Sequence, residues 1–555
     1  MSKKRIVIVG GVAGGASCAA RCRRLDETAE ILMLDRGPYV SFANCGLPYY
    51  VGDVIKDEAK LLVANPALFR DRFNIEVRTE HEVIAIDREA REIEVKDLAT
   101  DQTYREAYDA LVLSPGAAAV RPPLPGIDLP GIFVVRTVPD SRHIRAWINE
   151  KGAKSAVVVG GGFIGLEMAE NLVRRGLSVT VVEMLDQVMP PLDPEMAKPV
   201  QQHLEQHGVK VALGDGVAGF IESWDGRISV NTKSGAQHTG DIVILAIGVR
   251  PETALAKAAG LELGARGGIR VDERMQTNDP NIWAAGDAVE VMDVVTGDWT
   301  LIPLAGPANR QGRIAADGIC GRDSNFRGVQ GTAICGIFDL AVASTGASEK
   351  SLLHAGITDY EKVYLHPANH VGYYPGAKPI NLKLLFRKSD GKILGAQAVG
   401  EAGVDRRIDV IATAIQFGGT VFDLEESELC YAPQFGAAKD PVNFAGMIAA
   451  NSLRGDQPLA AWKQLLPDSA LLVDVRDPDE FDEGHIPGAV NLPLNELRAR
   501  LGELPRDREL WLYCRVGQRG YYAARILMQH GFKVKNLSGG YLTYDLIEAA
   551  SKNQL

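Results

Sequence analysis

The sequence predicts an α/β protein with two Rossmann-like βαβ units followed by further mixed and α/β regions. Two glycine-rich loops, at residues 10–15 and 160–165, each follow a short apolar strand and precede a helical pattern and a second strand that ends in an acid. This order of elements is typical of a dinucleotide-binding unit. At 555 residues the chain is also too long for one hydrophobic core, and its length favours about three to five domains.

The first βαβ unit lies at the N-terminus. Residues 4–9 form a short apolar strand, the loop leads into a helix that runs to Leu25, and the next strand ends at Asp35. Glycines allow the backbone to approach a pyrophosphate at the helix start, and Asp35 can accept hydrogen bonds from a ribose. Val12 replaces the second glycine of the G-x-G-x-x-G pattern, so this match is incomplete.

The second unit has the complete glycine pattern. A strand over 155–159 leads into the loop, a helix follows to Arg175, and the next strand ends at Glu183. Glu183 would bond a ribose 2′-hydroxyl and repel a 2′-phosphate. Because the next residue is Met184 rather than an arginine, we expect NADH here and NADPH less readily.

Two such units in one chain predict one flavin and one nicotinamide. The stretch 277–287 indicates which unit binds which cofactor. It is expected to form a strand that ends in a turn of small residues with Asp287 at its tip, as in flavin sites. The N-terminal unit with this stretch is therefore expected to bind FAD, with the NAD unit inserted within it. Residues 111–116 and 244–248 are expected to be the crossings between the two, although the same apolar pattern fits any buried parallel strand.

Composition excludes several classes of partner and site. The net charge is −11, from 60 basic and 71 acidic residues, without a basic run long enough to follow a nucleic acid. No stretch approaches the roughly 20 apolar residues of a membrane span. The 7 cysteines are scattered without metal-binding pairs, so we expect no metal and a cytoplasmic location.

Two cysteines have a chemical rationale. Cys45 stands alone in the string Ser41-Phe42-Ala43-Asn44-Cys45-Gly46-Leu47-Pro48-Tyr49, and the next cysteine in sequence is Cys320. Cys514 begins a six-residue loop whose amides could converge on a sulfur anion, with positive charge from Arg515 and Arg519. A hydride source, a flavin and two such thiols point to the reduction of sulfur bonded to sulfur.

These motifs carry a family resemblance over essentially the whole chain. Through the Cys45 string, residues 1 to 450 resemble the coenzyme A disulfide reductase branch of the pyridine nucleotide disulfide oxidoreductases. Residues 458 to 550 resemble a rhodanese in four places: 473–476, 480–481, 484–489 and the Cys514 loop. The fusion is similar to the NADH-dependent persulfide reductases, which couple FAD and coenzyme A chemistry to a rhodanese domain.

The resemblance implies four domains. We expect an FAD-binding domain over 1–117 and 249–325, an NAD-binding domain over 118–248, an α+β dimerisation domain over 326–450, a linker over 451–460 and an α/β rhodanese domain over 461–555. It also implies a homodimer, in which tyrosines of one subunit reach the substrate sulfur of the other.

The resemblance also implies the site residues. Catalytic roles fall to Cys45, Cys514, Tyr373 or Tyr374, and Tyr431. FAD would contact Gly10, Gly11, Ala13, Gly14, Asp35, Arg36, Asn44, Val83, Ser114, Gly116, Asp287, Pro303 and Ala305. NAD would contact Gly160, Gly162, Phe163, Ile164, Gly165, Glu167, Glu183 and Gly248. Coenzyme A would contact Ser17, Arg21, Arg24, Ser41, Asn44 and Arg72, and the sulfur-carrying loop would comprise Cys514, Arg515, Val516, Gly517, Gln518 and Arg519.

The chain departs from the family pattern at two positions. Phe73 stands where some members have a lysine that contacts coenzyme A, with Arg72 beside it. Gly520 stands where some active rhodanese loops have serine or threonine, which leaves the sulfur donor open.

The predicted reaction uses NADH and FAD to reduce coenzyme A persulfide, polysulfide or similar small persulfides at Cys45, with release of hydrosulfide and with Cys514 as sulfur carrier. One alternative is a coenzyme A disulfide reductase that maintains a thiol pool, with an incidental rhodanese domain. Another is an NADH oxidase or peroxidase that cycles Cys45 through a sulfenic acid, which gives Cys514 no role. A redox-sensing docking module is a fourth reading, which the intact cofactor motifs oppose.

Overall fold

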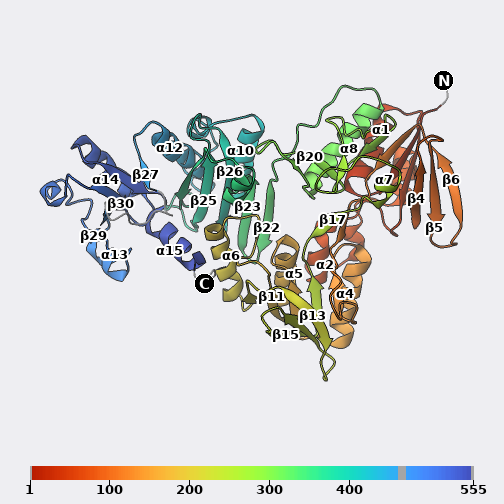
Figure 1. Ribbon diagram of the computed structural model, residues 1–555, viewed down its shortest axis with the longest axis horizontal. Helices are drawn as coiled ribbons and strands as arrows, with labels where there is room; N and C mark the ends of the chain where they lie inside the picture. The colour runs from red at the N-terminus through yellow and green to blue at the C-terminus, as the bar shows by residue number, and fades with distance from the viewer. Residues whose placement is uncertain (1–2, 461–469, 552–555) are drawn as a thin grey trace. The chain divides into compact units, whose positions relative to one another are not determined.

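The computed structural model describes residues 3–460 and 470–551 (Figure 1). The predicted α/β class is confirmed, with both parallel and antiparallel sheets. The chain forms two compact units, residues 1–184 with 208–329 and residues 185–207 with 330–555. The expected start of the last domain at 461, and its end at 555, lie outside the described residues.

The first unit contains the N-terminal parallel sheet. Its strand order is β19-β7-β1-β2-β3, with the bounds β1 Arg5–Val9, β2 Glu30–Asp35, β3 Glu76–Thr79, β7 Ala110–Leu113 and β19 Ile282–Ala284. Near-continuous apolar strands such as Ala110–Leu113 are buried along their whole length, as expected for a parallel sheet covered on both faces. Helix α1 (Ala13–Leu25) packs against α8 (Ala305–Ile319).

A second parallel sheet in the first unit has the order β12-β11-β10-β16-β9. Its strands are β9 Ile132–Val134, β10 Ser155–Val159, β11 Ser178–Val182, β12 Lys210–Ala212 and β16 Ile242–Leu245, with helices α4 Val138–Lys151 and α5 Phe163–Arg174. Strands β8 (Ala117–Ala119) and β17 (Val249–Pro251) pair antiparallel where the chain passes between the two sheets. The strands that directly follow the two predicted crossings, 111–116 and 244–248, therefore pair with each other.

Smaller elements complete the first unit. They are the sheets β4 His81–Asp87, β5 Glu92–Asp97 and β6 Thr103–Ala107; β13 Val217–Glu222, β14 Ile228–Thr232 and β15 Gln237–Gly240; and β18 Ile269–Arg270, β20 Val289–Met292 and β21 Trp299–Thr300. The short helices are α2 Leu47–Val51, α3 Pro66–Phe73 and α7 Ala254–Ala258. Across residues 3–460 and 470–551, no helix combines the length and the apolar character that crossing a bilayer requires.

The second unit contains a five-stranded antiparallel sheet of order β22-β23-β26-β25-β24. Its strands are β22 Ala333–Ile337, β23 Leu340–Gly346, β24 Glu361–Leu365, β25 Ile380–Phe386 and β26 Ile393–Gly400. Its helices are α6 Pro194–Gln206, α9 Glu349–His354, α10 Val404–Gln416, α11 Val421–Glu425 and α12 Pro441–Leu453. Helix α6 comes from a distant part of the sequence, yet it contacts β23 and β26.

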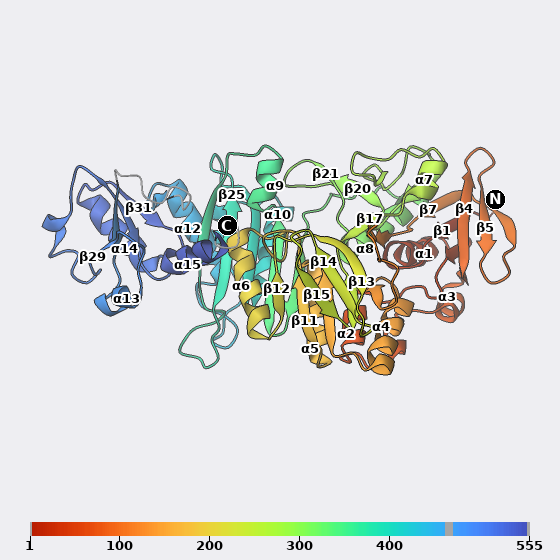
Figure 2. The same ribbon diagram turned by 60° about the horizontal axis from the view of Figure 1, so that its bottom comes forward.

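The C-terminal part of the second unit is a parallel sheet of order β27-β31-β30-β28-β29. Its elements are β27 Leu459–Ala460, β28 Ala470–Asp474, β29 Val490–Asn491, β30 Glu509–Tyr513, β31 Val534–Leu537, α13 Pro478–Glu483, α14 Gln518–Gln529 and α15 Gly540–Ser551. Helix α15 lies beside α6, as Figure 2 shows.

A buried lysine joins these parts of the second unit. Lys383 on β25 is fully buried, and its Nζ lies 2.8 Å from Asp193, 2.5 Å from Glu195 and 2.5 Å from Glu349. Burial opposes the charge, but the surrounding acids hold the pKa of Lys383 above its ordinary value. One cation thus contacts carboxylates from the start of α6 and from α9, and Glu349 also pairs with Lys362 at 2.7 Å.

We expect Lys383→Met to destabilise the second unit by about 3–5 kcal/mol, because the buried carboxylates would lose their counter-ion. The measurement is the urea midpoint of unfolding by circular dichroism. Lys388→Met, at an exposed lysine two residues beyond the end of β25, is the matched control and should change stability by less than about 0.5 kcal/mol. Equal midpoints for the two variants would contradict this role for Lys383.

Candidate functional site

Backbone packing shapes the first glycine loop. Gly10 has φ +94°, and a Cβ there would lie 2.0 Å from the carbonyl oxygen of Ser114. A Cβ on Gly15 would lie 1.8 Å from the carbonyl oxygen of Gly10. Any side chain at either position would therefore force β1, α1 and the segment after β7 apart.

Asp35 closes this loop at the end of β2. One carboxylate oxygen accepts a hydrogen bond from the Gly11 amide and the other from the Gly37 amide, each at 2.8 Å. Burial raises the pKa of Asp35, against the effect of these two hydrogen bonds. The acid that the sequence places at the strand end thus lies at the loop itself.

The other residues expected around FAD lie in separate places. Gly14, Ser114 and Ala285 converge, since a Cβ on Gly14 would lie 2.8 Å from Ser114 Oγ and 3.3 Å from the Cβ of Ala285. Asp287 follows β19 and pairs with Arg136 at 3.2 Å, and a Cβ on Gly116 would approach the same arginine. Elsewhere, Arg36 pairs with Glu252, Val83 is buried in β4, and Pro303 and Ala305 are exposed at the start of α8.

The second glycine loop repeats this construction. A Cβ on Gly160 (φ +108°) would lie 2.4 Å from the carbonyl oxygen of Ala246, and one on Gly165 would lie 1.9 Å from that of Gly160. Gly162, by contrast, faces open space at the start of α5. Glu183 accepts a hydrogen bond from the Gly161 amide at 2.6 Å, as Asp35 does in the first loop. This open backbone at a helix start fits a pyrophosphate.

The remaining residues expected around NAD lie on or near this loop. Phe163 and Ile164 begin α5, and Ile164 is exposed. Gly248 follows β16 with φ +104°. Glu167, one turn along α5, accepts a hydrogen bond from the Tyr49 hydroxyl at 3.2 Å. Burial raises the pKa of Glu167 to about 7.

Cys45 lies in a 3-10 turn over Asn44–Gly46 that leads directly into α2. The residue is exposed and free of disulfide. Partial burial of its thiol, followed by the charges of Glu167 and Asp287, raises the pKa of Cys45. Next to it, Oδ1 of Asn44 is buried with no hydrogen-bond partner among the described residues, which suits a ligand that donates a hydrogen bond.

The next cysteine along the chain is engaged elsewhere. Hydrogen bonding to Cys22, together with burial, raises the pKa of Cys320. Cys18 joins the same group, with its sulfur 4.0 Å from that of Cys22. Cys320 follows α8 and packs against the hydrophobic core that contains Cys18 and Cys22, so it belongs to that core rather than to the turn that carries Cys45.

The residues expected to contact coenzyme A are only partly available. Ser17, Arg21 and Arg24 share one stripe of α1. Ser17 donates a hydrogen bond to Asn309, and Arg21 pairs with Asp317 at 2.8 Å. Arg24 and Arg72 are exposed, while Ser41 adopts φ +48°.

Two of the three expected tyrosines meet on the surface of the second unit. The hydroxyls of Tyr373 and Tyr431 lie 2.7 Å apart. Tyr374 instead packs edge-to-face on His370. The exposed fraction of the residue is 74% for Tyr373, 45% for Tyr431 and 42% for Tyr374. The structure thus distinguishes Tyr373 from its neighbour, which the sequence could not.

The Cys514 loop connects β30 to α14. Cys514 is 1% exposed, and its sulfur accepts a hydrogen bond from the Gly517 amide at 3.2 Å. Arg519 points to Glu480, with two contacts of 2.6 and 2.7 Å, so its charge is shared with an acid. Arg515 and Gln518 are placed on the outer side of the loop, and Gln518 bonds the Tyr522 hydroxyl.

The sequence did not predict which residues support this loop from behind. The amides of Tyr541 and Leu542 donate to the carbonyls of Cys514 and Arg515 at 2.8 and 3.0 Å. A Cβ on Gly540 would lie 2.1 Å from the Cys514 carbonyl oxygen. The start of α15 therefore holds the loop from behind.

The same segment contacts the antiparallel sheet. The amide of Tyr364 on β24 donates to Ser538 Oγ at 2.8 Å, and His366 bonds Thr543 at 2.8 Å. The Tyr364 hydroxyl donates to Glu195 at 2.8 Å. No local pattern signals these partners, because they are 169 to 177 residues apart.

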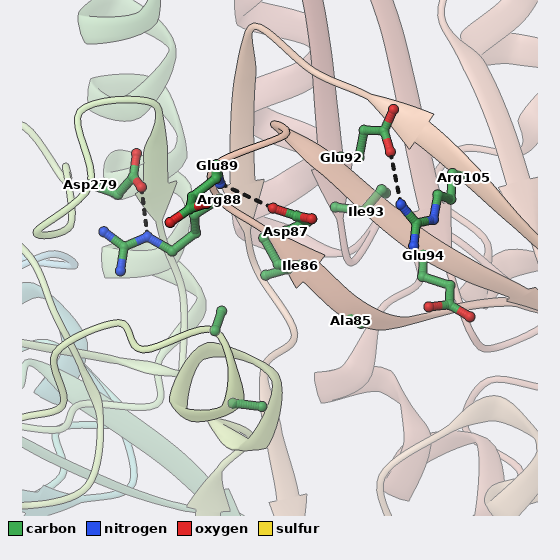
Figure 3. Close-up of a pocket in the computed structure, with 12 residues that line it drawn as sticks. Ala85, Ile86, Asp87, Arg88, Glu89, Glu92, Ile93, Glu94, Arg105 and Asp279 are labelled. Carbon is green, nitrogen blue, oxygen red and sulfur yellow. Dashed lines mark hydrogen bonds and ion pairs between the residues drawn. The ribbon is translucent and has the colours of Figure 1, made fainter.

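An open pocket of about 760 Å³ lies apart from the glycine loops (Figure 3). It is lined by the β4–β5 hairpin, α7 and Asp279, and it includes the ion pairs Arg88–Asp279 and Glu92–Arg105. None of the residues expected to bind a cofactor lines it. Its mainly acidic rim does not suit a phosphorylated ligand.

Comparison with known families agrees with the fold. The family described as "Pyridine nucleotide-disulphide oxidoreductase" matches residues 4–312, and its dimerisation domain matches residues 332–440. A rhodanese-like domain matches residues 459–545.

Three known proteins illustrate the similarity. A coenzyme A disulfide reductase of Staphylococcus epidermidis is 38% identical over 446 residues, which are 80% of this chain and 99% of that protein. The structure of reduced Bacillus anthracis CoADR-RHD has a TM-score of 0.96 at 50% identity and covers 99% of this chain and 98% of that one. The structure of an NAD-dependent persulfide reductase from A. fulgidus has a TM-score of 0.90 at 38% identity and covers 97% and 100%.

We expect Glu167→Gln to lower the pKa of Cys45, because above about pH 7 the Glu167 carboxylate opposes the negative charge of the thiolate. The measurement is the pH dependence of Cys45 alkylation by iodoacetamide in the reduced holoprotein, followed by mass spectrometry. The profile should move to lower pH. Glu170→Gln is the matched control, since Glu170 lies on the same helix and pairs with Arg174 at 2.8 Å. A profile that stays in place or moves to higher pH would refute this coupling.

Proposed function

The chain belongs to the pyridine nucleotide-disulphide oxidoreductases, and from this premise we propose that it uses NADH to reduce sulfur–sulfur bonds of small persulfides. The leading substrates are coenzyme A persulfide and polysulfide. The observation that carries this proposal is the pair of unlike thiols in one chain. Cys45 is exposed without a suitable second cysteine, and Cys514 is held in a loop built for a sulfur anion.

The chemistry at Cys45 follows from this arrangement. The Cys45 thiolate attacks the inner sulfur of a persulfide, so that a mixed disulfide forms between Cys45 and the carrier thiol and hydrosulfide leaves. Two electrons and a proton then return the carrier thiol and the Cys45 thiolate. Because Cys320 packs against the core beside Cys22, we assign the second sulfur of the bond to the substrate.

The cofactor assignment rests on the two glycine loops. The first loop would hold FAD and the second NADH, and this pair, when bound, would supply the two electrons. Asp35 and Glu183 each lie at the loop amides, where a ribose can exchange with or join the existing hydrogen bond. Glu183 would repel the additional phosphate of NADPH, which supports NADH. The close backbone contacts at Gly10 and Gly160 fit this role, because they leave the loop amides clear for phosphate.

Coenzyme A would be held by the stripe on α1 and by Asn44. Arg24 and Arg72 are exposed and suit its phosphates, while Arg21 can contribute alongside Asp317. The Asn44 oxygen that lacks a partner would accept a hydrogen bond from the pantetheine amide. The dimerisation domain supports a homodimer, and we assign the hydrogen-bonded Tyr373 and Tyr431 to the substrate sulfur of the partner subunit.

Cys514 would accept sulfane sulfur from a donor and pass it to the carrier thiol. A sulfur on Cys514 would be stabilised by the Gly517 amide and by Arg519. With Cys514 only 1% exposed, the loop accepts a small donor such as polysulfide more readily than a bulky one.

The deciding experiment is anaerobic NADH oxidation with coenzyme A persulfide, coenzyme A disulfide or polysulfide, with hydrosulfide measured alongside. Cys45→Ser should lower persulfide turnover by at least about 100-fold, as expected for loss of a nucleophile. Cys514→Ser should reduce turnover of polysulfide and leave that of coenzyme A persulfide near the parent rate. Cys335→Ser, at a buried cysteine outside both sites, is the control.

Two outcomes would overturn the proposal. Preferred turnover of coenzyme A disulfide, with no effect of Cys514→Ser on any substrate, would indicate a thiol-pool reductase. Equally fast NADH oxidation with oxygen as the acceptor would indicate an oxidase.

A further inference from the structure

Two histidines and a carboxylate converge in the second unit, away from both thiols. His203 and His207 lie one turn apart at the C-terminal end of α6, and Asp339 lies in the two-residue loop between β22 and β23. Nε2 of His203 is 2.8 Å and Nε2 of His207 is 4.0 Å from Oδ1 of Asp339. Ligand atoms of all three lie within 4.8 Å of one another.

The tautomer of His207 suits a metal ligand. Its Nδ1 lies 2.9 Å from the carbonyl oxygen of His203. A carbonyl can only accept, so Nδ1 carries the proton and Nε2 of the neutral ring presents a lone pair toward Asp339. Metal-binding histidines are commonly oriented by such a hydrogen bond from the other ring nitrogen.

The Nε2 atom of His203 lacks a well-aligned hydrogen bond at the same point. Its Nε2 is buried, and despite the 2.8 Å approach to Asp339 it makes no well-aligned hydrogen bond. A bound cation would satisfy both this nitrogen and the carboxylate. The pair is therefore not fully accounted for as an ordinary hydrogen bond.

The hairpin holds Asp339 against the helix through a strained residue. Phe338 has φ +58°, in the left-handed region that favours glycine. Its ring stacks on that of His207, with centroids 4.0 Å apart and planes within 8°. The stacking fixes the imidazole and aligns the loop with the end of α6, and such strain persists where surrounding contacts determine it.

Charge and ligand type identify the ion. Imidazoles bind metal ions in their neutral form, so the ligand set would carry the single negative charge of Asp339. Lys378, whose charge interacts with Asp339, is compensated by Glu401 at 2.7 Å. Imidazole favours Zn²⁺ and similar transition ions over Mg²⁺ and Ca²⁺, which prefer oxygen ligands. Asp339 is 67% exposed, so the ion can enter and water can complete the coordination.

We propose that His203, His207 and Asp339 form a binding site for one divalent transition ion such as Zn²⁺. The ion would cross-link the end of α6 to the β22–β23 hairpin. Because the native state alone assembles the three ligands, binding would stabilise the second unit. The site is independent of the reaction proposed above.

The test is isothermal titration of the FAD-loaded protein with Zn²⁺, together with its thermal midpoint with and without the ion. Exposed thiols also bind zinc, so the parent for this experiment carries Cys45→Ser and Cys430→Ser. We expect one Zn²⁺ per chain and a higher midpoint with zinc. His203→Gln, His207→Gln and Asp339→Asn should each weaken binding by at least about tenfold and remove the rise.

His530→Gln is the matched control, because His530 also ends a helix and is exposed. It should titrate like the parent, and far-UV circular dichroism together with the thermal midpoint without zinc shows whether each variant keeps a folded second unit. Absence of zinc binding by the parent would overturn the proposal. So would Asp339→Asn or His203→Gln variants that bind zinc as the parent does.

Discussion

The neutralisation of buried acids by Lys383 is the interaction on which the second unit depends. Asp193 and Glu195 belong to the start of α6, which comes from the middle of the chain, while Lys383 and Glu349 belong to the antiparallel sheet and its helix α9. Glu349 also pairs with Lys362 at 2.7 Å, but Asp193 and Glu195 are buried acids for which Lys383 is the paired cation. Through the Tyr364 hydroxyl on Glu195 and its amide on Ser538, the same cluster also extends to the C-terminal sheet.

The segment that supports the Cys514 loop is itself hydrogen-bonded to the antiparallel sheet. Ser538 and Thr543 bond β24 and its flanking histidine, while Gly540 and Tyr541 contact the Cys514 carbonyl. The Cys514 loop is therefore held between α14 and the segment 538–543, which is anchored on its other side by the antiparallel sheet. These contacts hold the loop in the conformation that directs the Gly517 amide at the Cys514 sulfur.

The two glycine loops show how far local pattern extends. Strand, loop, helix and terminal acid were predictable at both, and the structure places Asp35 and Glu183 at equivalent loop amides. The incomplete glycine pattern at Val12 does not alter the construction, because the close contacts are made by Gly10 and Gly15. For Cys514, the Gly517 amide reaches the sulfur, while Arg519 is shared with Glu480. Those details depend on neighbours that the loop sequence does not specify.

The sequence by itself determined the α/β class, the order of the βαβ units, the family and the two unlike thiols, because each rests on short-range spacing of glycines, acids and cysteines. Only the tertiary structure decided that Tyr373 rather than Tyr374 meets Tyr431, that α6 joins the second unit, and that His203, His207 and Asp339 converge. The physical reason is the same in each case. These contacts join residues 58 to more than 130 positions apart, and burial and packing, which no local periodicity encodes, select such partners.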